Sequence, residues 1–138
     1  MKISLPLIVL LTVLCLELTG QSADSVKYIS LEPYYFHLNW LKTDKALLID
    51  VREFFEYKKS RIKDAVNIPS SGNIEFAGDT LDKELSLFLY CTSGFRSKRV
   101  AEKFGVMGFA GIFNLEGGFK AWKEEGFTVE RKKVRRKE

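Results

Sequence analysis

Two side chains, Cys91 and Arg96, are placed where they could do chemistry. Cys91 follows the apolar run 87–90, which is typical of a buried strand, and the small polar loop 92–95 separates it from Arg96. Apolar residues then recur at helical spacing, so we expect a helix over 97–107. Cys91 would then lie over a helix N-terminus, among loop N–H groups and near an arginine. Each of these features favours the thiolate, so the sequence predicts a reactive sulfur.

Several cysteine chemistries compete for this loop. A cysteine hydrolase needs a histidine base, and the only histidine, His37, falls within a predicted helix far from the loop in sequence. A thioredoxin-like site needs a second cysteine nearby and a metal site needs several soft ligands, so we predict no metal and no cofactor. A phosphatase-type loop has one residue more than the four that separate Cys91 from Arg96 here. The tighter ring fits a terminal sulfur atom on Cys91 better than a phosphate.

The beginning of the chain is typical of a signal peptide. Lys2 gives a positive start, the apolar run 3–16 is too short to span a bilayer, and small residues such as Ala23 offer cleavage points. We therefore expect residues 1–23 to be a signal peptide and the protein to have no stable membrane span. In a bacterium it would be exported to the periplasm, and otherwise to the secretory pathway or the cell exterior. An uncleaved N-terminal anchor is the alternative.

Export would leave a single thiol. The sequence has two cysteines, and Cys15 lies in the segment that we expect to be removed. The mature chain would keep Cys91 alone, with no possible internal disulfide. A lone cysteine is usually avoided in an oxidising compartment, which favours a function for Cys91. The alternative is an inert buried thiol at the end of a strand.

The body of the chain is close to neutral. The formal net charge is +4, but residues 131–138 hold six basic residues and one acidic residue, so residues 1–130 carry −1. We expect 24–128 to form one domain and 129–138 to be a disordered basic tail. Because no basic stripe crosses the domain, nucleic acid is not an expected partner.

The elements that position the loop alternate between strand and helix. Their strand-like runs are apolar throughout, which indicates an α/β fold with a small parallel sheet flanked by helices on both faces. Functional groups in such sheets lie beyond the carboxyl ends of the strands, which is where we place Cys91, Arg52 and Glu116. We expect strands over 26–29, 46–51, 65–68, 86–90 and 112–115, helices over 31–41, 53–59, 97–107 and 117–125, and loop with a helical turn over 70–84.

Two helices carry specific packing expectations. The first should begin after a Ser30 cap, with Pro33 in its first turn. In the last, Phe119 and Trp122 should pack inward. The residues of the first helix that we expect to face the core are Leu31, Tyr34, Tyr35, Leu38 and Leu41.

Four segments in order along the chain resemble the signatures of single-domain rhodaneses, the thiosulfate sulfurtransferase family. The loop 91–97 is similar to the active loop of that family, and 48–57, 62–69 and 115–122 are similar to three further family motifs. Together they extend over about 25–128. Any one of these motifs alone would be weak evidence of the family, whereas the four in order are specific evidence of it.

The resemblance implies sulfur transfer through a covalent intermediate. The Cys91 thiolate would attack the outer sulfur of thiosulfate or a similar small sulfur-containing anion and keep a persulfide, which a thiol or cyanide then accepts. Arg96 would receive the oxyanion of the donor, or alternatively make a surface ion pair. The resemblance also implies that Asp50, Arg52 and Glu56 form a network that fixes the floor of the site. The expected substrate-binding residues are Thr92, Ser93, Gly94, Phe95, Arg96 and Ser97.

Two other functions stay open. One is a sulfur-relay protein that passes its sulfur to a protein partner, and the other is a non-catalytic module that binds an anion in the loop. Thr92 stands where many relatives have a basic residue, and Ser60-Arg61 replaces a common Gly-His pair. These departures leave the natural sulfur donor open.

Overall fold

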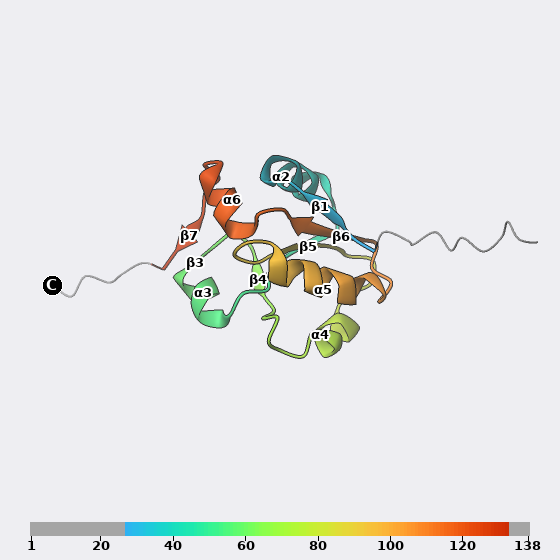
Figure 1. Cartoon of the computed structure of the whole chain (residues 1–138). Helices are drawn as coiled ribbons and strands as arrows, with labels where there is room; N and C mark the ends of the chain where they lie inside the picture. Colours follow the sequence, from blue (N-terminus) through green and yellow to red (C-terminus); the bar gives the residue numbers. More distant parts are fainter. Residues whose placement is uncertain (1–26, 133–138) are drawn as a thin grey trace, which may run out of the picture.

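Two apolar runs form the centre of a parallel sheet. In a computed structural model, which describes residues 27–132, β2 (Ala46–Asp50) pairs with β5 (Ser86–Tyr90) so that Asp50 lies opposite Tyr90 (Figure 1). Both strands therefore end at the same edge of the sheet. The predicted signal segment 1–23 lies outside the described residues, as does the end of the predicted tail, 133–138. Within 27–132, no helix is both long and apolar enough to cross a membrane.

Three more strands complete this sheet. Its order is β1-β6-β5-β2-β4, and all pairings are parallel. The outer strands are β1 (Ile29–Leu31), β6 (Gly111–Leu115) and β4 (Val66–Asn67). The chain leaves β2 towards one edge, to β4, and leaves β5 towards the other, to β6. The carboxyl ends of β2 and β5 therefore flank the point where the winding reverses, which is where α/β sheets place their sites.

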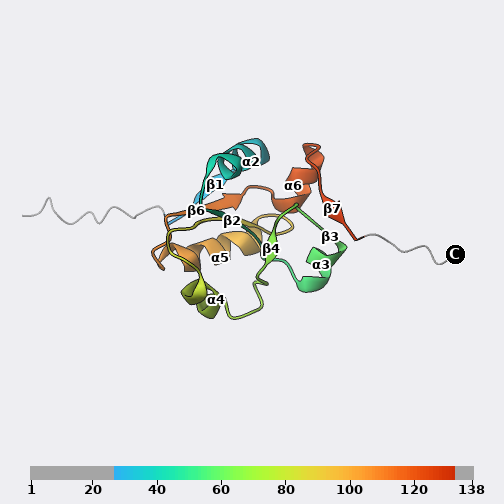
Figure 2. The ribbon, with the colours of Figure 1, turned by 180° about the vertical axis from the view of Figure 1, so that it is seen from behind.

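Helices cover both faces of the sheet, so the predicted fold class is confirmed (Figures 1 and 2). On one face, α5 (Phe95–Gly105) and α4 (Ile74–Thr80) pack against alternate residues of β2 and β5 such as Ile49 and Leu89. On the other face, α2 (Pro33–Lys42) and α6 (Gly118–Glu124) cover Leu48 and Phe88. Phe119 and Trp122 of α6 are buried, as predicted.

The predicted core face of α2 is wrong at three of its five positions. Tyr34, Tyr35 and Leu41 are 58%, 54% and 66% exposed, whereas Phe36 is wholly buried. Apolar residues occur on several sides of this helix, so their spacing did not single out one face. Ser30 lies in β1 rather than at the helix cap, and the cap residue is Glu32, with Pro33 in the first turn.

Two segments beside the loop also differ from prediction. The helix α5 begins at Phe95 rather than at residue 97, because Gly94 takes the cap with a left-handed backbone (φ 92°) that glycine adopts freely. The stretch 70–84, predicted as loop with a helical turn, is helical over seven residues. It contains α4, where the Asn73 side chain caps the first turn by accepting a hydrogen bond from the backbone N–H of Phe76 at 2.9 Å.

The start of the predicted tail is ordered. Glu130 and Arg131 form β7, which pairs antiparallel with β3 (Ser60–Arg61). Glu130 also makes an ion pair with Arg61 at 3.1 Å. The predicted start of a disordered tail at residue 129 is therefore too early. The short helix α3 (Phe54–Lys59) connects β2 to β3.

Candidate active site

Cys91 lies at the carboxyl end of β5, as predicted. The strand residues Leu87 to Tyr90 before it are buried, and Cys91 itself is 1% exposed. Its strand lies between β2 and β6, so loops from three neighbouring strands converge on the thiol. The chain therefore holds the sulfur at the base of a narrow cradle.

Hydrogen-bond donors at the beginning of α5 surround the sulfur atom. The backbone N–H of Gly94 donates to Cys91 Sγ at 3.1 Å, and the hydroxyl of Ser97 donates at 3.5 Å. Burial by itself raises the pKa of Cys91. The Ser97 hydroxyl and the backbone N–H groups of Ser97, Ser93 and Gly94 more than offset this, so the pKa of Cys91 lies below its ordinary value. The cradle therefore favours the thiolate.

A second helix N-terminus holds the loop itself. The first residues of α6 direct their N–H groups at the loop carbonyls: Phe119 donates to Cys91 O at 2.7 Å and Lys120 to Thr92 O at 3.0 Å. This approach requires glycine at position 118. A Cβ on Gly118, whose φ is 62°, would lie 2.5 Å from Cys91 O and 2.7 Å from Ser93 N.

Arg96 is tied to a carboxylate at the mouth of the cradle. Its Nη1 donates to Glu56 Oε2 at 2.9 Å and its Nη2 to Glu56 Oε1 at 3.1 Å. Thr92 joins them, because its hydroxyl donates to Glu56 Oε1 at 3.1 Å and accepts from Arg96 Nη2 at 3.0 Å. The pKa of Glu56 is lowered to about 2, and its hydrogen bond from Arg96 is the largest cause. Of the two roles that the sequence allowed for Arg96, the structure contains the ion pair.

The predicted floor network is split in two. Arg52 binds Asp50 through Nε and Nη2 at 2.6–3.1 Å, and also donates to Ser60 O at 2.6 Å. Both side chains are buried, and the guanidinium lies 4.3 Å from the centre of the Phe119 ring. Glu56, which we expected in this network, instead binds Arg96. Burial by itself lowers the pKa of Arg52. The hydrogen bond to Asp50 and the charge of Asp50 raise it by more, so the net pKa of Arg52 is raised.

The other predicted site residues lie around this centre without contacting the sulfur through their side chains. Thr92 and Ser93 are exposed at the surface of the loop, and Phe95 is 69% exposed. His37 packs on the opposite face of the sheet, 5.2 Å from the ring of Trp122. Within 27–132, no group of three or more His, Cys, Asp or Glu side chains is placed to hold a metal ion.

Known proteins share this fold. The rhodanese-like domain family matches residues 37–125, which is more than half of the chain. The chain belongs to this family. A solved structure of a rhodanese-related protein from Thermoplasma volcanium superposes with a TM-score of 0.66 at 30% identity, over 75% of this chain and 98% of that one.

Two curated relatives of this rhodanese-like domain carry names that describe sulfur handling. YrkF of Bacillus subtilis, a putative sulfur carrier protein, is 32% identical over 107 residues, or 77% of this chain. The thiosulfate sulfurtransferase GlpE of Actinobacillus succinogenes is 28% identical over 90 residues, which cover 65% of this chain and 80% of GlpE. The chain spans only 56% of the length of YrkF. These two relatives are thus named as a putative sulfur carrier and a thiosulfate sulfurtransferase.

Proposed function

We propose that this rhodanese-like domain is a sulfurtransferase with Cys91 as its persulfide carrier. The observation that carries the proposal is the cradle of donors around Sγ, which lowers the pKa of the thiol in a chain whose one histidine lies on the other face of the sheet. A populated thiolate needs no base to attack. The proposed donor is thiosulfate or a similar small sulfur-containing anion, and the proposed acceptor is a thiol or cyanide.

The proposed reaction has two steps that balance without an external oxidant. The Cys91 thiolate attacks the outer sulfur of thiosulfate, the S–S bond of thiosulfate breaks, and sulfite leaves with the bonding electron pair. The outer sulfur then forms a persulfide anion on Cys91. In the second step the acceptor attacks that outer sulfur and the Cys91 thiolate leaves.

The depth of the cradle supports this choice of substrate. With Cys91 1% exposed, a donor has to present a single terminal atom rather than a bulky group. The N–H groups of Ser93 and Gly94 are then available to hold the negative charge of the persulfide. Arg96, with its side chain one-third exposed, and the exposed Thr92 stand at the mouth, where the oxyanion end of the donor would lie.

A relay function is the second candidate, in which the acceptor is a cysteine of a protein partner. The exposed ring of Phe95 supports it, because an apolar side chain 69% exposed beside the loop offers a contact for a second protein. YrkF, a putative sulfur carrier, is among the relatives. The signal-like segment 1–23 supports a further proposal, that the transfer takes place outside the cytoplasm.

Mass spectrometry after incubation with thiosulfate tests the enzyme directly. We expect one added sulfur on Cys91, release of sulfite, and turnover on addition of cyanide or a small thiol. Cys91→Ser should abolish all three, whereas Cys15→Ser, which removes the other cysteine, should leave them intact. Loading without turnover to small acceptors would favour the relay. An unloaded wild type, or loading that survives in Cys91→Ser, would contradict both, and an anion-binding module would remain.

A further inference from the structure

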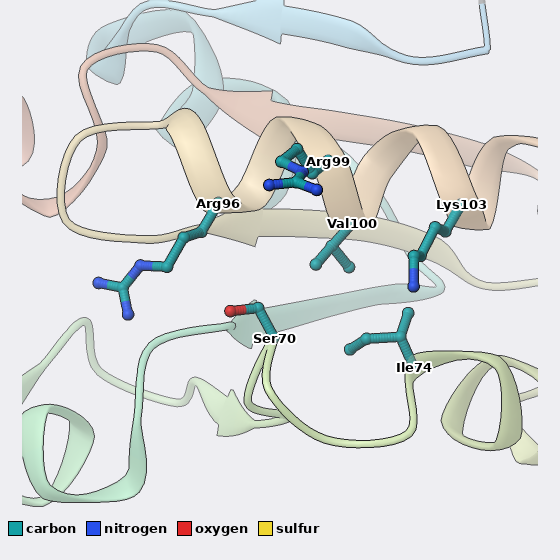
Figure 3. A pocket seen from close by; sticks show the side chains of 6 residues that line it. All are labelled: Ser70, Ile74, Arg96, Arg99, Val100 and Lys103. Carbon is teal, nitrogen blue, oxygen red and sulfur yellow. The ribbon is translucent and has the colours of Figure 1, made fainter.

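A pocket of about 210 Å³ opens next to the active loop, along α5. Four of its lining residues come from one side of that helix and two from the segment that leads into α4 (Figure 3). Ser70 and Ile74 form the wall opposite Val100 and Lys103. The lining residues are Ser70, Ile74, Arg96, Arg99, Val100 and Lys103.

The charge of this pocket is positive. Lys103 pairs with Glu75 at 2.8 Å and Arg96 with Glu56 at 2.9 Å. Arg99 lies between them on the helix and is exposed, and no acidic side chain of residues 27–132 pairs with it. One cation therefore remains available to an anion that enters the pocket. The side chains of Ile74 and Val100, both buried, offer an apolar wall beside it.

The pocket lies beside the loop that holds the sulfur. Arg96 both lines the pocket and donates to Thr92, the residue after Cys91, while Ser97 donates to Cys91 Sγ. Arg99 lies about 5 Å further along the helix axis than Arg96, at about 1.5 Å per residue. A volume of about 210 Å³ is several times the roughly 30 Å³ that one water occupies in the liquid, so the pocket has room for a small molecule.

We propose that this pocket binds the carboxylate end of a small mercapto-carboxylate, which is the sulfur acceptor. The inference rests on the proposed function and specifies its acceptor. The carboxylate binds Arg99, the short carbon chain lies against Val100 and Ile74, and the thiolate reaches the Cys91 persulfide. The thiolate attacks the outer sulfur, a new S–S bond forms on the acceptor, the persulfide S–S bond breaks, and the Cys91 thiolate leaves.

Acceptor kinetics on sulfur-loaded protein test this assignment. We compare mercaptopropionate with mercaptoethanol, which has the same reacting group without the carboxylate. Arg99→Gln should lower kcat/KM for mercaptopropionate by about threefold to fivefold, through KM, and leave mercaptoethanol unchanged. For each acceptor, the rate in Arg99→Gln is compared with its rate in the wild type. The different thiol pKa values of the two acceptors therefore do not affect the result.

Lys98→Gln is the matched control. It removes the same charge from the same helix, but Lys98 pairs with Glu116 rather than lining the pocket. Unchanged kinetics in this variant support the pocket. An equal loss in both variants, or a loss in Arg99→Gln for both acceptors, overturns the assignment while the sulfurtransferase stands.

A binding experiment tests the pocket independently of sulfur transfer. Methylthiopropionate, an unreactive thioether, is titrated into the unloaded protein and followed by amide NMR. We expect shifts confined to residues around Ile74, Arg99 and Lys103, and their loss in Arg99→Gln. The absence of shifts there overturns the inference, whereas their presence in a protein that thiosulfate does not load would contradict only the proposed function.

Discussion

Two arginine–carboxylate pairs lie within one small region of this domain, and they have opposite surroundings. Asp50 and Arg52 are buried under the loop, at the end of β2, and Arg52 also binds a backbone carbonyl. Glu56 and Arg96 bind each other at the surface, with side chains 23% and 33% exposed, and bracket Thr92. Water cannot replace a lost partner in the buried Asp50–Arg52 pair, whereas it can in the Glu56–Arg96 pair.

This difference in surroundings gives the two pairs different expected roles. A buried pair fixes the end of β2 and the turn into α3, and losing one partner strands a charge inside the protein. A pair at the surface can exchange a partner for solvent or for an anionic substrate at low cost. We therefore expect the Asp50–Arg52 pair to determine stability and the Glu56–Arg96 pair to determine how substrate enters.

The largest expected effect is on stability, in Arg52→Met. This variant leaves Asp50 buried without its guanidinium, and we expect the free energy of unfolding to fall by about 3–5 kcal/mol. Arg96→Met should cost about 1 kcal/mol, because Glu56 keeps water, the Thr92 hydroxyl and the backbone N–H of Glu53. Chemical denaturation of both variants measures the difference.

The double variant Asp50→Asn with Arg52→Met is the control for this comparison. Because it removes the stranded charge, it should recover part of the loss. Similar losses for Arg52→Met and Arg96→Met would contradict the distinction between the two pairs.

The next effect is the pH dependence of Glu56. Its pKa of about 2, against an ordinary 4.5, means that the folded state favours the carboxylate. The resulting stability, at most about 3 kcal/mol and shared by three donors, is fully present above about pH 4.5 and lost as the pH falls towards 2. The difference in unfolding free energy between wild type and Glu56→Gln should therefore shrink over that range.

Glu75→Gln is the matched control for the pH series. Glu75 also makes an ion pair, with Lys103, but in an exposed position. Its removal should produce a smaller change with pH than removal of Glu56. A pH-independent difference between wild type and Glu56→Gln would show that the carboxylate is not stabilised by folding.

The sequence was sufficient to place Cys91 and its sheet. The runs 46–49 and 87–90 are apolar without interruption, and such runs between helices specify buried parallel strands whose carboxyl ends lie together. The polar loop after the second run then locates the site. These are local signals, and the structure confirms them.

Contacts between distant residues could not be predicted in this way. Glu56 binds Arg96 forty residues later, and nothing in the chain between them marks that pairing rather than one with Arg52. The same holds for β3 and β7, whose two residues each are too few to show a period. In α2, apolar residues lie on several sides of the helix, and only packing against the sheet buries Phe36 and leaves Tyr34 and Leu41 exposed.

The last expected effect is on reactivity, in Ser97→Ala. The buried Ser97 hydroxyl donates to Cys91 Sγ, so its loss should raise the pKa of Cys91 and lower the alkylation rate at pH 7, measured as a pH profile with iodoacetamide. Unfolding free energy should fall by about 1 kcal/mol. Ser93→Ala is the control, because Ser93 contributes its backbone N–H and an exposed side chain. A shifted profile in Ser97→Ala alone would show that the buried Ser97 hydroxyl adjusts the charge of the sulfur with little effect on folding, whereas equal profiles in both variants would assign the thiolate to the backbone N–H groups.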